Sequence, residues 1–178
     1  MRIFVSDVSE LYARGISGSE AVRALLRYAV RQSWDMDCPE IKKLPNGKPY
    51  FDGHPDKFLS LSHSKDHVLV ALSERDVGAD IESLREIKGK PEKLFSSRML
   101  ADFGYFGGWT LRESVYKLCG KGSLRSMEFS LRGGEILSPF AGVLCRVYEC
   151  EGFAASAACA EGDFPDKIDM VDASLFYT

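Results

Sequence analysis

The chain has 178 residues, 45% hydrophobic and 28% charged, which is enough to bury one medium-sized core or two small ones. A formal net charge of −3 and a pI near 5.7 exclude the strongly basic composition typical of nucleic-acid-binding domains. Five cysteines without a Cys-x-x-Cys pair, and no apolar run of membrane-spanning length, favour a cytoplasmic protein with reduced thiols and no membrane partner.

The chain is predicted to start with a strand over residues 2–6 and one long helix. Ser17 or Ser19 can cap this helix, and an apolar stripe at helical spacing follows. Arg23 begins a basic row on the opposite face, which a solvated surface also explains. A turn at Pro45-Asn46-Gly47 then separates two extended pieces. A meander of three strands joined by short turns is expected over residues 58–62, 67–73 and 77–82.

The charged stretch 83–91, which contains Gly89 and Pro91, predicts a linker. We therefore divide the chain into an N-terminal half, residues 1–88, and a C-terminal half, residues 89–178. A helix or helical hairpin is expected over 91–103, with three glycines interrupting it before a second helix over 109–119. These glycines are Gly104, Gly107 and Gly108. Strand-like pieces follow at 127–131, 135–137, 143–150, 153–159 and 168–171.

The segment Val-Gly-Ala-Asp-Ile-Glu, residues 77–82, alternates as a strand does. Its apolar side chains share one face, and Asp80 and Glu82 share the other. Two carboxylates at this spacing lie within reach of one Mg²⁺. An exposed strand edge is the simpler explanation of the pair taken alone.

A third acid, Glu113, lies in a predicted helix, with Lys117 four residues later on the same face. Glu113 can complete a Mg²⁺-binding set and can take a proton from a hydroxyl, while Lys117 can neutralise charge on a phosphate oxygen. An ordinary helical ion pair between these two side chains is the alternative.

Two further groups suit an anionic ligand. Pro49 restricts Lys48 to extended backbone, which can present a fixed cation, although a plain turn is equally compatible. His63 lies between Ser62 and Ser64 at a strand end and offers an imidazole and two flanking hydroxyls to an anion, although a structural histidine fits as well.

An internal echo favours two similar halves. The run DHVLVALSERDVGADIE and the run GFAASAACAEGDFPDKIDM share a layout of strand, acidic turn and acid-bearing strand. The second copy lacks the Asp-x-Glu pair, which suggests a duplicated fold with one site.

These motifs, in their order, resemble those of the 4′-phosphopantetheinyl transferases of the surfactin-synthetase-activating type. That family shows Gly-Lys-Pro, a Phe-Asn-x-Ser-His-Ser-like strand, Gly-x-Asp-x-Glu, Trp-x-x-Lys-Glu-(Ser/Ala)-x-x-Lys and Gly-x-Gly-Leu. The corresponding stretches here are GKP at 47–49, FLSLSHS at 58–64, GADIE at 78–82, WTLRESVYK at 109–117 and GKGSL at 120–124. The similarity runs from about Ser19 to the C-terminus.

The resemblance implies an α+β fold of two similar halves, a pseudo-dimer in which each half has a small, mostly antiparallel sheet and a helix. It implies an enzyme that moves 4′-phosphopantetheine from coenzyme A to a serine of an apo acyl or peptidyl carrier protein. The products would be holo-carrier protein and 3′,5′-ADP, and we expect a monomer.

The resemblance also assigns roles to residues. Asp80, Glu82 and Glu113 would bind Mg²⁺. Glu113 would act as the base, and Lys117 would stabilise the departing diphosphate group. The expected coenzyme A contacts, besides Lys117, are Lys48 and Pro49 by the adenine, and Ser62, His63 and Arg23 by the 3′-phosphate.

Several positions depart from the family pattern. Arg112 replaces a lysine, Leu59 replaces an asparagine and Met99 replaces an acid. Most of the basic N-terminal segment of longer members is also missing. We therefore expect an active enzyme with altered coenzyme A affinity.

Two other classes of function remain open. One is a metal-dependent nuclease, although the net negative charge of the chain argues against binding to nucleic acid. The other is a non-catalytic module that binds coenzyme A or a carrier protein.

Overall fold

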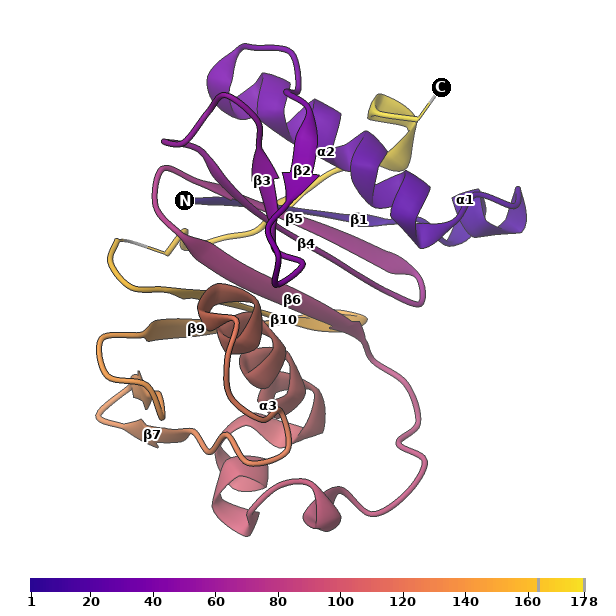
Figure 1. Cartoon of the computed structure of the whole chain (residues 1–178). Helices are drawn as coiled ribbons and strands as arrows, with labels where there is room; N and C mark the ends of the chain where they lie inside the picture. The colour runs from indigo at the N-terminus through magenta and orange to yellow at the C-terminus, as the bar shows by residue number, and fades with distance from the viewer. Residues whose placement is uncertain (163, 178) are drawn as a thin grey trace.

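A computed structural model describes residues 1–162 and 164–177, and within them the chain is an α+β protein of small, largely antiparallel sheets with three α-helices (Figure 1). The first part contains β1 (Arg2–Asp7), α1 (Ser9–Ala13), α2 (Gly18–Trp34), β2 (Ile41–Lys43), β3 (Pro49–Phe51), β4 (Phe58–Ser64), β5 (His67–Ser73) and β6 (Val77–Ser83). The second part contains η1 (Pro91–Lys93), α3 (Ser97–Cys119), β7 (Ser130–Arg132), β8 (Glu135–Leu137), β9 (Leu144–Cys150), β10 (Phe153–Cys159), β11 (Asp169–Met170) and η2 (Ala173–Leu175).

The first sheet has the strand order β11-β1-β5-β4, and α2 covers one of its faces. Phe4, Val68 and Val70 point from the strands toward α2, which contributes the apolar stripe predicted from its sequence. Because side chains alternate along a strand, Ile3 and Leu69 point to the opposite face.

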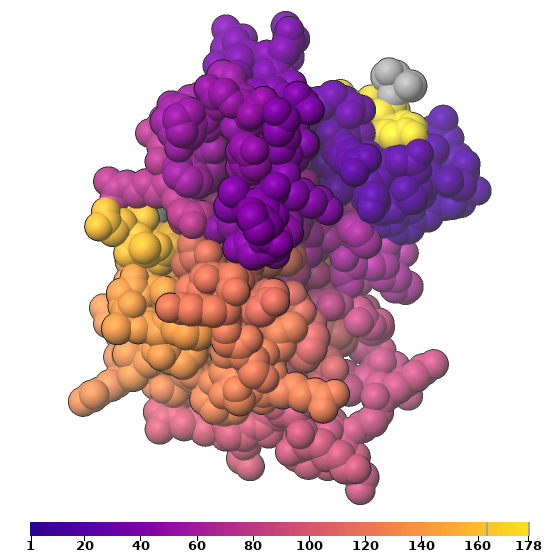
Figure 2. All heavy atoms as spheres, in the orientation of Figure 1, coloured from indigo at the N-terminus to yellow at the C-terminus, as the bar shows by residue number. Residues whose placement is uncertain are grey.

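The second sheet has the order β6-β10-β9, and α3 covers one of its faces. Its other face packs against the first sheet, where Val77, Ala79 and Ile81 meet the outward-facing residues of β1 and β5. The molecule therefore has four layers in the order α2, first sheet, second sheet, α3, which can be followed from top to bottom in Figure 1. In the space-filling view, the first part of the chain lies directly against the orange second part (Figure 2).

Several predicted elements are confirmed. The helix α2 begins after Ser17, whose hydroxyl accepts a hydrogen bond from the backbone N–H of Glu20 while the Glu20 carboxylate bonds back to Ser17. The predicted turn joins β2 to β3, and β4, β5 and β6 follow with short connections. The predicted meander of these three strands is wrong, because β6 pairs with β10 in the second sheet and not with β5.

The predicted break in the helical region 91–119 is confirmed at one of the three glycines. Helix α3 has a kink at Gly104, whose φ of 64° and ψ of −173° are non-helical and open to glycine alone, and helical residues lie on both sides of it. Other predicted boundaries are wrong. Gly107 and Gly108 lie inside the helix, and Gly108 gives room for Phe95 and Met99. The strand β4 extends to Ser64, and α1 was not predicted because five residues carry too little periodicity.

Two positions of the predicted layout, Asp163 in the second copy of the echo and Thr178 at the end of the second half, lie outside the described residues. Among the described residues, no helix has both the length and the apolar character needed to cross a membrane.

Candidate active site

Strand β6 lies where the second sheet, the edge of the first sheet and helix α3 meet. As the alternation predicts, Val77, Ala79 and Ile81 enter the core between the sheets. Asp80 is only 5% exposed, so the exposed strand edge considered for the Asp-x-Glu pair is wrong. The buried carboxylate needs partners, and it finds them on β4 and α3.

Gly78 lets α3 rest directly on β6. A Cβ atom at this position would lie 2.0 Å from the carbonyl oxygen of Ser114 and 2.5 Å from the backbone nitrogen of Leu118. These are backbone atoms, so no side-chain rotation relieves the clash. The glycine of the Gly-x-Asp-x-Glu motif therefore brings the helix that carries Glu113 and Lys117 against the strand that carries Asp80.

Asp80 joins three elements. Its Oδ1 accepts hydrogen bonds from the Ser62 hydroxyl of β4 at 2.6 Å and from Lys117 Nζ of α3 at 2.7 Å. Lys117 Nζ also donates to the backbone carbonyls of Leu61 at 3.3 Å and Ala79 at 3.2 Å. Among the described residues Lys117 thus pairs with Asp80 and not with Glu113, and all three of its ammonium protons have protein acceptors.

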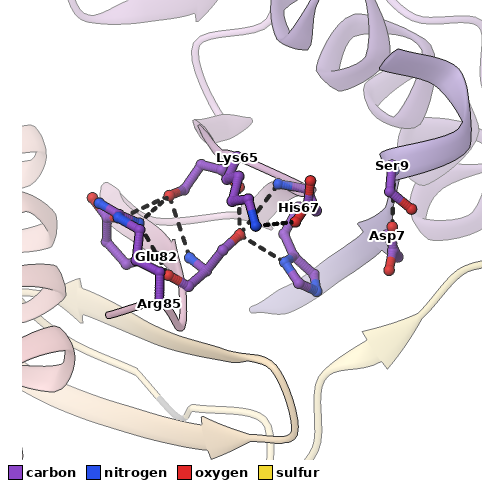
Figure 3. Close-up of polar contacts among 9 residues, drawn as sticks. Asp7, Ser9, Lys65, His67, Glu82 and Arg85 are labelled. Atoms are coloured by element: carbon purple, nitrogen blue, oxygen red, sulfur yellow. Dashed lines mark hydrogen bonds and ion pairs between the residues drawn. The ribbon is translucent and has the colours of Figure 1, made fainter. Parts of the chain in front are cut away.

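Glu82 has a second pair of partners, drawn in Figure 3. Its Oε2 accepts hydrogen bonds from the Ser64 hydroxyl at 2.6 Å and from Arg85 Nη1 at 2.8 Å. Each acid of the motif is therefore held by one serine of β4 and by one cation.

Glu113 is half-buried on α3 and faces the same acids. Burial raises the pKa of its carboxyl above the ordinary value, the negative charges of Asp80 and Glu82 raise it further, and Lys117 partly offsets them. Glu113 therefore lies close enough to β6 for the charges of Asp80 and Glu82 to act on its carboxyl.

The donor set has the chemistry of a Mg²⁺ site, since it consists of carboxylate oxygens from two facing elements. Within residues 1–162 and 164–177, however, no three His, Cys, Asp or Glu side chains already surround one point closely enough to hold a metal ion. Asp80 and Glu82 are turned toward Lys117 and Arg85 instead.

A row of serines joins the two sheets beside these acids. Ser60, at the start of the row, accepts a hydrogen bond from the backbone N–H of Ala79 at 2.9 Å and donates to its carbonyl at 3.3 Å. Ser62 and Ser64 then bond to Asp80 and Glu82. Ser62, predicted to contact a phosphate, is therefore in this structure a partner of Asp80.

A cleft of about 500 Å³ opens above these residues. All six residues predicted to contact coenzyme A line it, and they come from α2, the β2–β3 hairpin, β4 and α3. They are Arg23, Lys48, Pro49, Ser62, His63 and Lys117. The predicted metal ligands do not line this cleft, but Ser62 and Lys117 connect its floor to Asp80.

Two of the three lysines that line the cleft, Lys48 and Lys117, are already paired. Lys48 Nζ forms an ion pair with Asp76 and donates to the backbone carbonyl of Leu118 at 3.1 Å, which ties the β2–β3 hairpin to the end of α3. Arg23 and His63 also line the cleft, and their side chains form no hydrogen bond to other described residues.

The hydroxyl of Ser64, expected with that of Ser62 to face an anion, donates instead to Glu82. Sequence reasoning did not identify Arg85 as a site residue. Arg85 carries no periodic signal, because it lies in the linker that follows β6.

The comparisons with known proteins agree with the order of the motifs. No family model matches the chain. The 4′-phosphopantetheinyl transferase ffp of Bacillus subtilis is 26% identical over 169 residues, covering 83% of this chain and 75% of the relative. A further 4′-phosphopantetheinyl transferase of Bacillus subtilis is 27% identical over 168 residues, with 82% and 75% covered. The 4′-phosphopantetheinyl transferase psf-1 of Bacillus pumilus is 30% identical over 111 residues, covering 55% of this chain and 48% of the relative.

The chain is thus an α+β protein with three electrostatically coupled carboxylates on β6 and α3, beside a cleft. Distant homologues over most of its length are 4′-phosphopantetheinyl transferases, as the motifs predicted.

Proposed function

We propose that this protein is a Mg²⁺-dependent 4′-phosphopantetheinyl transferase that modifies a serine of an apo acyl or peptidyl carrier protein. Coenzyme A would be the donor, and holo-carrier protein and 3′,5′-ADP the products. The distant homologues support the reaction class.

One observation carries the proposal. Six residues that the motifs assign to coenzyme A, from elements far apart in sequence, line a single cleft. Two of them, Ser62 and Lys117, bond directly to Asp80, so the cleft leads to the acids. A ligand with an adenine at Lys48 and a phosphate at Arg23 and His63 would extend toward these acids.

We also propose that the fold consists of two related units. The segments β1-α2-β4-β5 and β6-α3-β9-β10 each run as strand, helix and hairpin. In both, the last strand of the segment lies between the other two, as the orders β1-β5-β4 and β6-β10-β9 record. The cleft is lined by residues of both segments, which supports a single ligand site between two copies. The boundary near residue 88 stays a prediction.

In the proposed reaction Asp80, Glu82 and Glu113 would hold Mg²⁺, which when bound neutralises charge on the diphosphate. Glu113 takes the proton of the carrier serine, and its raised pKa makes it a stronger base than an exposed glutamate. Lys117 stabilises the departing phosphate oxygen by exchanging one of its carbonyl acceptors for that oxygen.

A transfer assay tests this function. Incubation with coenzyme A, Mg²⁺ and a panel of apo carrier proteins should add the mass of one 4′-phosphopantetheine group, measured by mass spectrometry. Glu113→Gln keeps the shape of the side chain but removes the base, so the rate should fall by about 10²- to 10⁴-fold. Glu10→Gln, an exposed change on α1, serves as the control and should have no effect.

Coenzyme A binding without transfer to any carrier would contradict an enzyme and favour a binding module. Cleavage of plasmid DNA that is lost in Asp80→Ala would favour the nuclease instead.

A further inference from the structure

Arg85 holds one of the three acids from outside both sheets. It is the second residue of the linker after β6, and its side chain is 46% exposed. Its Nη1 lies 2.8 Å from Glu82 Oε2 and 3.0 Å from the carbonyl oxygen of Ser83 (Figure 3). Its guanidinium carbon lies 5.5 Å from the ring centre of Phe106.

The other partner of Glu82 is fixed in the fold. Ser64, which donates to Glu82, belongs to β4, and its carbonyl accepts a hydrogen bond from the Ser83 hydroxyl at 2.6 Å. The Ser83 hydroxyl in turn lies 2.8 Å from Nδ1 of the buried His67 (Figure 3). Ser64 therefore keeps its place, and Arg85 is the partner that can leave without disturbing a sheet.

Arg85 and a divalent cation would compete for Glu82 because both carry positive charge. Arg85 and Ser64 both donate to the same oxygen, Oε2 of Glu82. A divalent cation bound to Glu82 would stand within a few ångströms of the guanidinium, and like charges at that distance repel. The two cations therefore compete for one carboxylate.

We propose that Arg85 is a built-in counter-ion of Glu82 that weakens divalent-cation binding and is released with the linker when the cation binds. The inference rests on the proposed metal-dependent function and adds a positioning residue that lies outside the motifs. Release would also free the linker residues next to Arg85, Leu84 and Ile87, whose apolar side chains are already exposed.

Direct cation binding provides the first test. Mn²⁺ affinity is measured by electron paramagnetic resonance on wild type and on Arg85→Gln. Removal of the competitor should tighten binding by about two- to five-fold, the range of an exposed ion pair. Arg75→Gln is the matched control, because it removes one positive charge from another surface ion pair, with Glu161, and should leave the affinity unchanged.

Trypsin provides a second test on the unmodified protein. The enzyme cleaves after arginine and lysine, so cleavage after Arg85 requires a free guanidinium, while cleavage after Lys88 in the same linker serves as the internal standard. Saturating Mn²⁺ should raise the ratio of the Arg85 cut to the Lys88 cut above the value in chelator.

The outcomes separate this inference from the proposed function. Mn²⁺ binding with equal affinity in wild type and Arg85→Gln, or an unchanged cleavage ratio, would overturn the role of Arg85 and leave the transferase intact. Failure of wild type to bind Mn²⁺ would overturn the inference together with the proposed metal site. Failure of carrier modification in the transfer assay, with Mn²⁺ binding as described, would count against the transferase alone.

Discussion

Arg112 lies one residue before Glu113, yet its guanidinium points away from the acids. The side chain is fully buried and donates to the carbonyl oxygens of Met127 at 2.7 Å and Leu94 at 2.8 Å. Its ion pair with Glu128 and its position 4.2 Å from the ring centre of Phe95 complete its contacts there. Burial lowers the pKa of Arg112, and the Glu128 carboxylate partly offsets this. Its surroundings indicate a structural role, so our expectation that this residue alters coenzyme A affinity loses its basis.

Arg112→Lys should therefore reduce stability and leave ligand binding unchanged. One ammonium group cannot reach both carbonyls and Glu128 as the forked guanidinium does, so buried acceptors lose partners. We expect the free energy of unfolding in urea to fall by about 1–3 kcal/mol. Arg98→Lys, at an exposed ion pair with Asp102, is the control and should change stability little. A weaker coenzyme A affinity in calorimetry at unchanged stability would contradict the structural role.

Side chains of the site differ in how far the sequence predicts them. Asp80, Glu82 and Glu113 were predictable because strand and helix periodicity determine which residues share a face. The roles of Ser64 and Arg85 depend on β4 lying beside β6, and this contact between strands of different sheets leaves no periodic signal in the sequence.

At the scale of elements, the site depends on how closely α3 approaches β6. Helix axes usually lie about 10 Å from the sheet they cover because side chains fill the space between. At Gly78 the backbone of the helix replaces those side chains, since Ser114 and Leu118 occupy the position of a Cβ atom. The distance between Asp80 and the groups on α3 is thus determined by one glycine.

Gly78→Ala should separate α3 from β6. The backbone clash should cost about 1–3 kcal/mol of unfolding free energy or more, and should lower transfer activity further than stability alone explains, because Glu113 and Lys117 move away from Asp80. Gly107→Ala is the matched control. Its Cβ would make ordinary contacts of 3.5 Å or longer, and alanine favours a helix by up to about 1 kcal/mol, so stability should be kept or raised. Equal stability and activity in the two variants would contradict this role of Gly78.

The glycines also show why α3 was predicted as two pieces. Glycine in a helix interior is unfavourable by about 1 kcal/mol, so three glycines within five residues predict an interruption. Only Gly104 has a non-helical conformation. Gly108 stays helical because Phe95 and Met99 pack against its bare backbone, and that tertiary contact outweighs the local preference.

For the whole molecule, the sequence predicts the α+β class but not the four layers. The layers depend on β6 pairing with β10, which joins Val77 to Cys159, and on β1 pairing with β11, which joins Phe4 to Asp169. Such distant pairings are determined by the cores that the sheets share, and no local pattern encodes them. The consequence is that β6, from the first part of the chain, belongs to the second sheet, and β11, from near the C-terminus, belongs to the first sheet.

This sharing predicts that the protein unfolds as one unit. The core between the sheets takes Ile3 and Val5 from the first sheet and Ala79 and Ala155 from the second, so each sheet loses one of its two buried faces if the other unfolds. The two tryptophans report on opposite layers, since Trp34 packs on Phe51 beside α2 and Trp109 packs in the α3 layer.

Trp34→Phe leaves Trp109 as the only fluorescent tryptophan, and Trp109→Phe leaves Trp34. In each variant we expect the fluorescence transition in urea to coincide with the loss of the helical circular dichroism signal. Val5 lies at the centre of the shared core, so adding Val5→Ala to either variant removes a buried contact from both layers. The free energy of unfolding should therefore fall by about 1.5–3 kcal/mol, and by an equal amount in the two variants. Two separate transitions, or a Val5→Ala effect on Trp34 fluorescence alone, would show that the layers unfold independently. In that case the cleft between α2, β4 and α3 would open when only one layer unfolds, while the other layer stays folded. Ligand binding would then raise the urea midpoint of one fluorescence transition but not of the other.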